Sequence, residues 1–251
     1  MGLVVLTALG IGGATVIGAI IGFCFKKIDE RWNDGILGFA AGIMLAAAIL
    51  GLIIPSMEQA GKSGIWMTVV GVLCGGLFLI FADKLTPHLH HLTGVKEEEH
   101  KNNAHLNKVM LFVLAIAIHN LPEGLAAGGG VGAGDMGNAL TIAFGIALQN
   151  IPEGMVIISP MILSGVSKGR TFIIALMTGL VEVIGTFIGY LAAGVSAAVL
   201  PVCLAFAGGT MLYVISDEMI PETHSHGYER FATYALLIGF LVMILMDTFL
   251  A

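Results

Sequence analysis

Long runs of apolar residues alternate along the chain with short polar stretches. Runs of roughly 17–25 apolar residues are long enough to cross the hydrocarbon core of a bilayer as α-helices. Because the runs are continuous and do not alternate with polar positions, they favour helices over the strands of a membrane barrel. The pattern predicts an all-α integral membrane protein with eight transmembrane helices at residues 3–25, 35–57, 64–82, 109–130, 137–163, 171–193, 199–220 and 231–251.

The composition supports a protein that lies within the lipid bilayer. Hydrophobic residues make up 57% of the 251 residues and charged residues only 11%, whereas a soluble domain usually carries roughly 25% charged residues. The one long polar stretch, residues 83–108, is predicted to be a loop, so residues 1–251 form a single transmembrane domain. The net charge of −6, without a basic patch, excludes nucleic acid as an expected partner.

The basic residues predict the orientation in the membrane. Ten of the eleven lysine and arginine residues fall in the first, third, fifth and seventh connections between the predicted helices. Only Lys62 falls in an even-numbered connection. Because basic loops stay in the cytoplasm, loops 1, 3, 5 and 7 are expected to be cytoplasmic and both termini extracytoplasmic.

Two similar polar motifs interrupt the apolar runs. HNLPEG occupies residues 119–124 of the fourth predicted helix, and QNIPEG occupies residues 149–154 of the fifth. Within each motif the polar residues are three or four positions apart, so they share one helix face. Consecutive helices run antiparallel, which brings both motifs to a similar depth, and a glutamate of the sixth helix can join them. The candidate cluster comprises His119, Asn120, Glu123, Gln149, Asn150, Glu153 and Glu182.

The proline and glycine of each motif add to this polar pocket. Pro122 and Pro152 cannot donate a backbone hydrogen bond, so each leaves a carbonyl oxygen free at the membrane centre. Gly124 and Gly154 allow the bent backbone to pack closely against a neighbouring helix. The motifs therefore predict a pocket of carboxylates, amides, one imidazole and free carbonyls.

Three ionised carboxylates need compensation in a hydrocarbon interior, where each charge costs about 2.5–3.5 kcal/mol on insertion scales. They must hold either protons or cations. Glu123 and Glu153 are placed to bridge two metal ions roughly 3.5–4 Å apart. The alternative is that the polar residues only hold helices together, through contacts that contribute ~0.6 kcal/mol on average. Repetition of the motif on two facing helices favours a cation site.

With these motifs the chain resembles the ZIP family of divalent-metal transporters, and within it the ZupT-like bacterial branch. The resemblance covers the whole chain and implies a 3+2+3 helix arrangement with an inverted repeat, in a bacterial inner (plasma) membrane. It also implies a binuclear metal centre between helices four, five and six, and it suggests a homodimer, which nothing in the spacing shows. Met44 resembles a methionine of helix two that lines the access to that centre. The metal positions of the family fall on His119, Asn120, Glu123, Gln149, Asn150, Glu153 and Glu182.

Two positions depart from the common family pattern. Many members carry histidine where this chain has Gln149, and some carry aspartate where it has Asn150. An oxygen-rich site with one imidazole favours zinc less strongly than a site with two histidines. The sequence therefore predicts uptake of zinc into the cytoplasm, with iron, manganese, cobalt and cadmium also accepted. The metal is expected to be a bound substrate, and no cofactor is expected.

Two other functions remain as alternatives. A proton-coupled exchanger of calcium or sodium would also use carboxylate and amide ligands, although His119 favours transition metals. An intramembrane metal-dependent hydrolase would need a nucleophile or an activated water, but there is no HExxH motif, and no serine or cysteine flanks the cluster. The chain is therefore expected not to be an enzyme.

Further histidines lie in segments predicted to be cytoplasmic. They form either a weak receiver or sensor for ions that leave the pore, or simply a solvated loop. Glu222, with Asp217 and Glu218, could line the exit near the inner end of the seventh helix. The cytoplasmic histidines are His88, His90, His91, His100, His105, His224 and His226.

Overall fold

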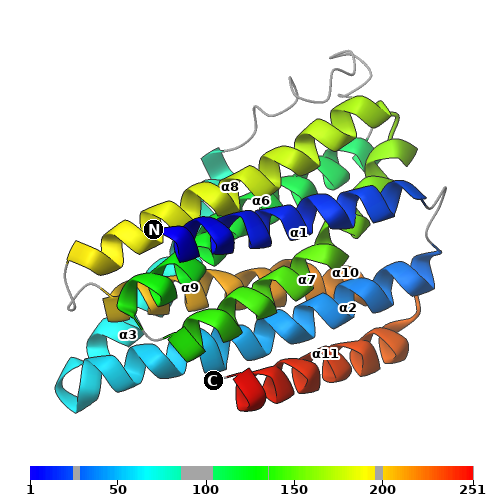
Figure 1. The fold of residues 1–251 in the computed structure, drawn as a ribbon. Helices are drawn as coiled ribbons and strands as arrows, with labels where there is room; N and C mark the ends of the chain where they lie inside the picture. The colour runs from blue at the N-terminus through cyan, green and yellow to red at the C-terminus, as the bar shows by residue number, and fades with distance from the viewer. Residues whose placement is uncertain (25–28, 86–103, 135, 196–199, 251) are drawn as a thin grey trace.

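The chain folds into long helices that run side by side (Figure 1). The computed structural model describes residues 1–24, 29–85, 104–134, 136–195 and 200–250, and these residues contain helices and turns but no strand. The all-helical class predicted from the sequence is confirmed. The elements are α1 (Gly2–Cys24), α2 (Glu30–Ala46), the π-helix η1 (Ala47–Ile53), α3 (Ile54–Leu85), α6 (Ala104–Ala133), α7 (Met136–Leu163), α8 (Lys168–Val195), α9 (Leu200–Val214), the π-helix η2 (Ile215–Met219), α10 (Ile220–Thr223) and α11 (Glu229–Leu250).

Six segments of the described chain are long and apolar enough to cross a membrane, which confirms the integral membrane class. The second of these segments extends over 52 residues and contains Gly61. Gly61 has φ 63° and ψ −178°, so the helix is broken there. Only glycine reaches this backbone conformation without a steric cost. The six segments are Gly2–Cys24, Glu30–Phe81, Ala139–Ile162, Lys168–Ala193, Pro201–Thr223 and Glu229–Phe249.

The helix ends shorten the stretch that the sequence predicts to be a loop. Residues 83–108 were expected to connect two helices, but α3 continues to Leu85 and α6 begins at Ala104.

Four helices surround the two sequence motifs. Among these four helices, α6 packs extensively against α8 and α1 against α7, and α1 also packs against α8. The motif glycines lie at these crossings. A Cβ atom added to Gly124 would overlap the backbone carbonyl of Glu182, and one added to Gly154 would overlap that of Thr15. The close backbone approach predicted for the two glycines is therefore confirmed.

Two π-helical segments were not predicted from the sequence. Both η1 and η2 end directly before an Ile-Pro dipeptide, at Ile54–Pro55 and Ile220–Pro221. A proline within a helix removes one hydrogen bond and crowds the carbonyl of the residue four positions earlier, and a wider turn relieves that crowding. The two segments also pack reciprocally, because η1 contacts α9 and η2 contacts α2.

Basic residues segregate between the two ends of the bundle. Both termini lie at one end, whereas α2, α8 and α11 all begin at the other end (Figure 1). Arg31, Arg170 and Arg230 are exposed in the first turns of these three helices. Lys62 is exposed next to the break at Gly61.

Candidate metal centre

The carboxylate of Glu182, on α8, accepts hydrogen bonds from side chains of three other helices, α1, α6 and α7. It is fully buried in the middle of α8. Its Oε1 atom accepts hydrogen bonds from Thr15 Oγ1 at 2.7 Å and from Asn120 Nδ2 at 2.7 Å. Its Oε2 atom accepts a hydrogen bond from Asn150 Nδ2 at 2.6 Å. The structure therefore brings together three of the residues that the sequence analysis singled out, from α6, α7 and α8.

A second contact joins the two motifs to each other. Gln149 Nε2 on α7 donates a hydrogen bond to Glu123 Oε1 on α6, and both side chains are fully buried. Glu153 is also buried, with 1% of its surface exposed. The carboxyl groups of Glu123, Glu153 and Glu182 lie close enough to interact electrostatically. Three carboxyl groups from three helices thus share one interior region.

Several oxygen atoms of this cluster accept no hydrogen bond from the described residues. Each amide uses its NH₂ group as a donor to a carboxylate, and its carbonyl oxygen remains. A buried polar atom without a hydrogen bond costs roughly 1–3 kcal/mol, and carboxylate and amide oxygens are ligands for divalent cations. The donor set therefore fits a cation. Within the described part of the chain, the buried oxygens without a hydrogen-bond partner include Asn120 Oδ1, Glu123 Oε2, Gln149 Oε1 and Asn150 Oδ1.

Two predicted site residues are not joined to this cluster by the described contacts. The side chain of His119 lies outside the described residues, although its backbone belongs to α6. Met44 on α2 is completely buried in an apolar cluster that also contains Ile11 and Met211. Among the side chains that the structure describes, no group of three or more His, Cys, Asp or Glu residues has a metal-binding arrangement. The carboxyl groups are instead accompanied by the side-chain amides of Asn120, Gln149 and Asn150.

The sequence analysis missed the contribution of α1. Besides the Thr15 hydroxyl, the backbone carbonyl of Ile11 accepts a hydrogen bond from Asn150 Nδ2 at 3.2 Å. The carbonyl of Thr178 accepts one from Asn120 Nδ2 at the same distance. Thr15 is one of two threonines in the first apolar run, and a threonine in an apolar helix does not indicate which neighbour it faces.

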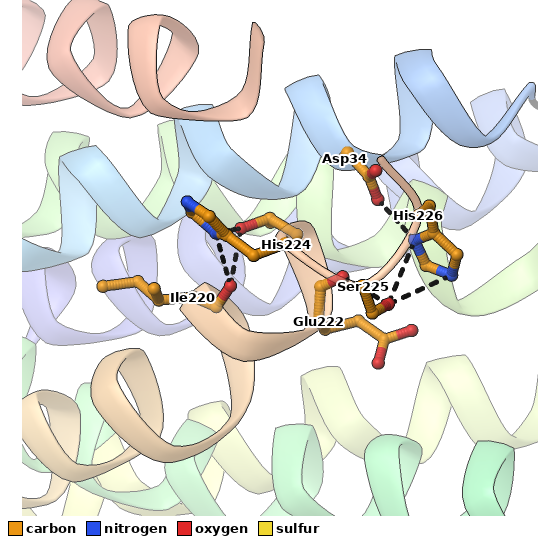
Figure 2. Close-up of polar contacts among 7 residues, drawn as sticks. Asp34, Ile220, Glu222, His224, Ser225 and His226 are labelled. Carbon is orange, nitrogen blue, oxygen red and sulfur yellow. Dashed lines mark hydrogen bonds and ion pairs between the residues drawn. The ribbon is translucent and has the colours of Figure 1, made fainter. Parts of the chain in front are cut away.

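A separate polar cluster lies where α10 joins α11 (Figure 2). His226 Nδ1 is 2.9 Å from Asp34 Oδ1, and the Asp34 side chain is completely buried. His224 Nδ1 lies 2.8 Å from the carbonyl oxygen of Ile220. Glu222 belongs to the same turn (Figure 2). Two histidines predicted to be cytoplasmic therefore have defined partners, and one of them ties this turn to α2.

The other histidines predicted to be cytoplasmic belong to the predicted third loop. His88, His90, His91 and His100 lie outside the described residues, as does the side chain of His105. Their role as receivers of metal stays a prediction. Asp34 was not singled out from the sequence, because nothing local relates it to a histidine 192 positions away.

A bundle of apolar helices that buries carboxyl and amide side chains in its interior defines a membrane protein that handles cations. Comparison with known sequences specifies the class further. The sequence model of the family described as ZIP Zinc transporter matches residues 95–247. The chain is 41% identical to the zinc transporter GufA of Myxococcus xanthus, over 98% of each chain. It is 37% identical to the zinc transporter ZIPB of Bordetella bronchiseptica, over 94% of this chain and 77% of that protein.

A third relative belongs to the branch that the sequence analysis indicated. The chain is 31% identical to the zinc transporter ZupT of Streptococcus mutans, over 95% of this chain and 94% of that protein. The chain belongs to the ZIP family of zinc transporters. It is therefore a divalent-metal transporter and not an enzyme, and neither the calcium or sodium exchanger nor the intramembrane hydrolase is favoured.

Proposed function

We propose that the chain carries zinc and related divalent metals into the cytoplasm through a binuclear centre between α6, α7 and α8. The observation that carries this proposal is the burial of three mutually close carboxyl groups beside amide oxygens that have no hydrogen-bond partner within the described chain. The names of the relatives support zinc as the cargo. The proposed ligands are His119, Asn120, Glu123, Gln149, Asn150, Glu153 and Glu182.

The chemistry follows from the cost of burying charge. A doubly positive ion offsets the repulsion among Glu123, Glu153 and Glu182 and satisfies amide oxygens that have no partner among the described residues. Glu123 and Glu153 occupy equivalent places in the two motifs, so we assign them as the bridging ligands between two ions. Protons that occupy the empty carboxyl groups leave when a metal ion enters, because the two compete for the same oxygens.

The ligand set also predicts the range of metals. One imidazole among many oxygens does not select strongly for zinc, which prefers nitrogen and sulfur ligands. Iron, manganese, cobalt and cadmium should therefore compete with zinc for uptake. Met44 is proposed to line the route from outside to the centre, because it is buried on α2 in the apolar cluster that also contains Ile11 of α1.

For the membrane topology we propose eight spans in a 3+2+3 arrangement with an inverted repeat. The break at Gly61 supports two spans within Glu30–Phe81, and the 30 residues of α6 are long enough for another. The reciprocal packing of η1 with α9 and of η2 with α2 supports the repeat. The exposed arginines at the end opposite the termini support extracytoplasmic termini in the bacterial inner membrane. That the protein forms a homodimer is proposed from the family resemblance alone.

Uptake of zinc into vesicles that contain the purified protein tests the proposal. Glu123→Ala and Glu153→Ala should abolish zinc uptake, because each removes a proposed bridging ligand. Glu229→Ala, in the exposed first turn of α11, is the control and should transport like the wild type. Wild-type uptake of calcium or sodium but not zinc, or zinc uptake by both ligand variants, would overturn the proposal. Repeating the assay with an imposed proton gradient shows whether protons drive transport.

A further inference from the structure

Thr15 contacts the candidate centre from a helix that carries none of its proposed ligands. Its side chain is completely buried on α1, and its hydroxyl donates a 2.7 Å hydrogen bond to Glu182 Oε1. We propose that Thr15 is a positioning residue. Its hydrogen bond helps to occupy Oε1 of Glu182, so that Oε2 is the oxygen that faces the metal ion. This inference rests on the proposed function.

The two oxygens of the Glu182 carboxylate are unequally occupied. Among the described residues, Oε1 accepts bonds from both Thr15 and Asn120, whereas Oε2 accepts one bond, from Asn150. A carboxylate oxygen offers about two acceptor positions. Oε1 is therefore filled by the protein, and Oε2 keeps one position for a cation. Without the Thr15 hydroxyl the two oxygens would be equivalent, and the carboxylate could rotate between them.

Three other buried threonines bond within their own helix, which Thr15 does not. The hydroxyls of Thr178, Thr186 and Thr210 each donate to a backbone carbonyl three or four residues earlier in their own helix. This local bond is the common arrangement for threonine in an apolar helix. Thr15 instead donates to a side chain 167 positions away, on a different helix.

The backbone of α1 is held firmly at this depth. Gly12 of α1 and Gly179 of α8 approach so closely that a Cβ atom on either would crowd the carbonyl of the other. A Cβ atom on Gly18 would overlap the carbonyl of Ile151 on α7. Because α1 is fixed against both helices and the β-branched side chain of threonine has few rotamers, the hydroxyl of Thr15 has little freedom to leave Glu182.

The test measures zinc affinity and transport in three variants of Thr15. Thr15→Val keeps the shape but removes the donor, and it should weaken zinc binding and raise the KM for uptake by about ten-fold, as loss of a group that orients a metal ligand usually does. Thr15→Ser keeps the hydroxyl and should stay within about twofold of the wild type. Thr15→Ala, compared with Thr15→Ser, isolates the hydroxyl if the valine variant folds poorly. Thr210→Val, at a buried threonine bonded within α9, is the control for general destabilisation.

A double-mutant cycle separates positioning from packing. If Thr15 acts through Glu182, Thr15→Val should have no further effect on zinc affinity once Glu182→Ala is present. A Thr15→Val variant with unchanged KM and zinc affinity, or an undiminished effect in the Glu182→Ala background, would overturn the inference. A wild-type protein that neither binds nor transports zinc would instead overturn the proposed function.

Discussion

The side-chain amide of Gln149 donates a hydrogen bond to a carboxylate oxygen of Glu123, which links the two repeated motifs across the interface of α6 and α7. The resemblance to the family implies a histidine in many members at the position of Gln149. The glutamine fixes Glu123 and leaves its own carbonyl oxygen buried without a partner among the described residues. In the proposed centre this position supplies an oxygen where a histidine would supply a nitrogen, and it should set the metal preference.

Changing this residue should change selectivity. Gln149→His adds an imidazole nitrogen, which zinc prefers over a neutral oxygen and manganese does not. We expect the preference for zinc over manganese to rise by about ten-fold, equivalent to ~1.4 kcal/mol. Competition between the two metals for uptake into vesicles measures the ratio. An unchanged ratio would show that residue 149 is not a metal ligand.

The close approach of α1 and α7 predicts a large cost for a single methyl group. A Cβ atom in Gly154→Ala would overlap the backbone carbonyl of Thr15, so the helices must separate. We expect a loss of about 1–3 kcal/mol in stability, typical of overpacking, together with reduced zinc uptake. Thermal unfolding of the detergent-solubilised protein measures the change.

Gly10→Ala is the control for this substitution, because a Cβ atom at Gly10 on α1, the helix that Gly154 packs against, would meet nothing within 4 Å. Its stability should stay within about 0.5 kcal/mol of the wild type. Equal stability of the two variants would argue against the tight α1–α7 crossing.

The contact of His226 with Asp34 predicts an effect on stability that is separate from metal binding. His226→Ala leaves a completely buried carboxyl group without its histidine partner, which should cost roughly 1–3 kcal/mol. His226→Asn retains an N–H donor near the position of Nδ1 and should recover part of that loss. The KM for zinc should not change in either variant, because neither His226 nor Asp34 belongs to the proposed ligands.

Unfolding temperatures and uptake kinetics of the same two preparations distinguish the outcomes. A raised KM for zinc in His226→Ala would mean that the Asp34–His226 pair takes part in metal transfer, in agreement with the receiver role considered for the cytoplasmic histidines.

The clustering of Asn120, Asn150 and Glu182 could be predicted because helical spacing puts each motif on one face and antiparallel helices match their depth. The contribution of Thr15 could not, because threonine is common in apolar helices and the sequence does not show which side of α1 faces α8. The contact of Asp34 with His226 could not be predicted either, because it forms only when α2 and the turn before α11 come together in the fold.

The two π-helices could not be predicted from the sequence for a different reason. Pro55 and Pro221 predict a disturbance of the helix, but a proline can be accommodated by a kink, by a helix end or by a wider turn. Packing decides among these, and here η1 and η2 lie against α9 and α2 respectively. Their symmetry becomes visible only when the two helices are compared in space.

The number of zinc ions bound by the purified protein tests most directly whether Glu123, Glu153 and Glu182 gather around metal. The measurement compares the wild type with the double variant Glu123→Gln, Glu153→Gln, so that zinc held by the cytoplasmic histidines is common to both. A binuclear centre predicts that the double variant binds about two fewer zinc ions per chain, whereas Glu229→Gln binds as many as the wild type. Equal zinc content in the wild type and the double variant would contradict the account.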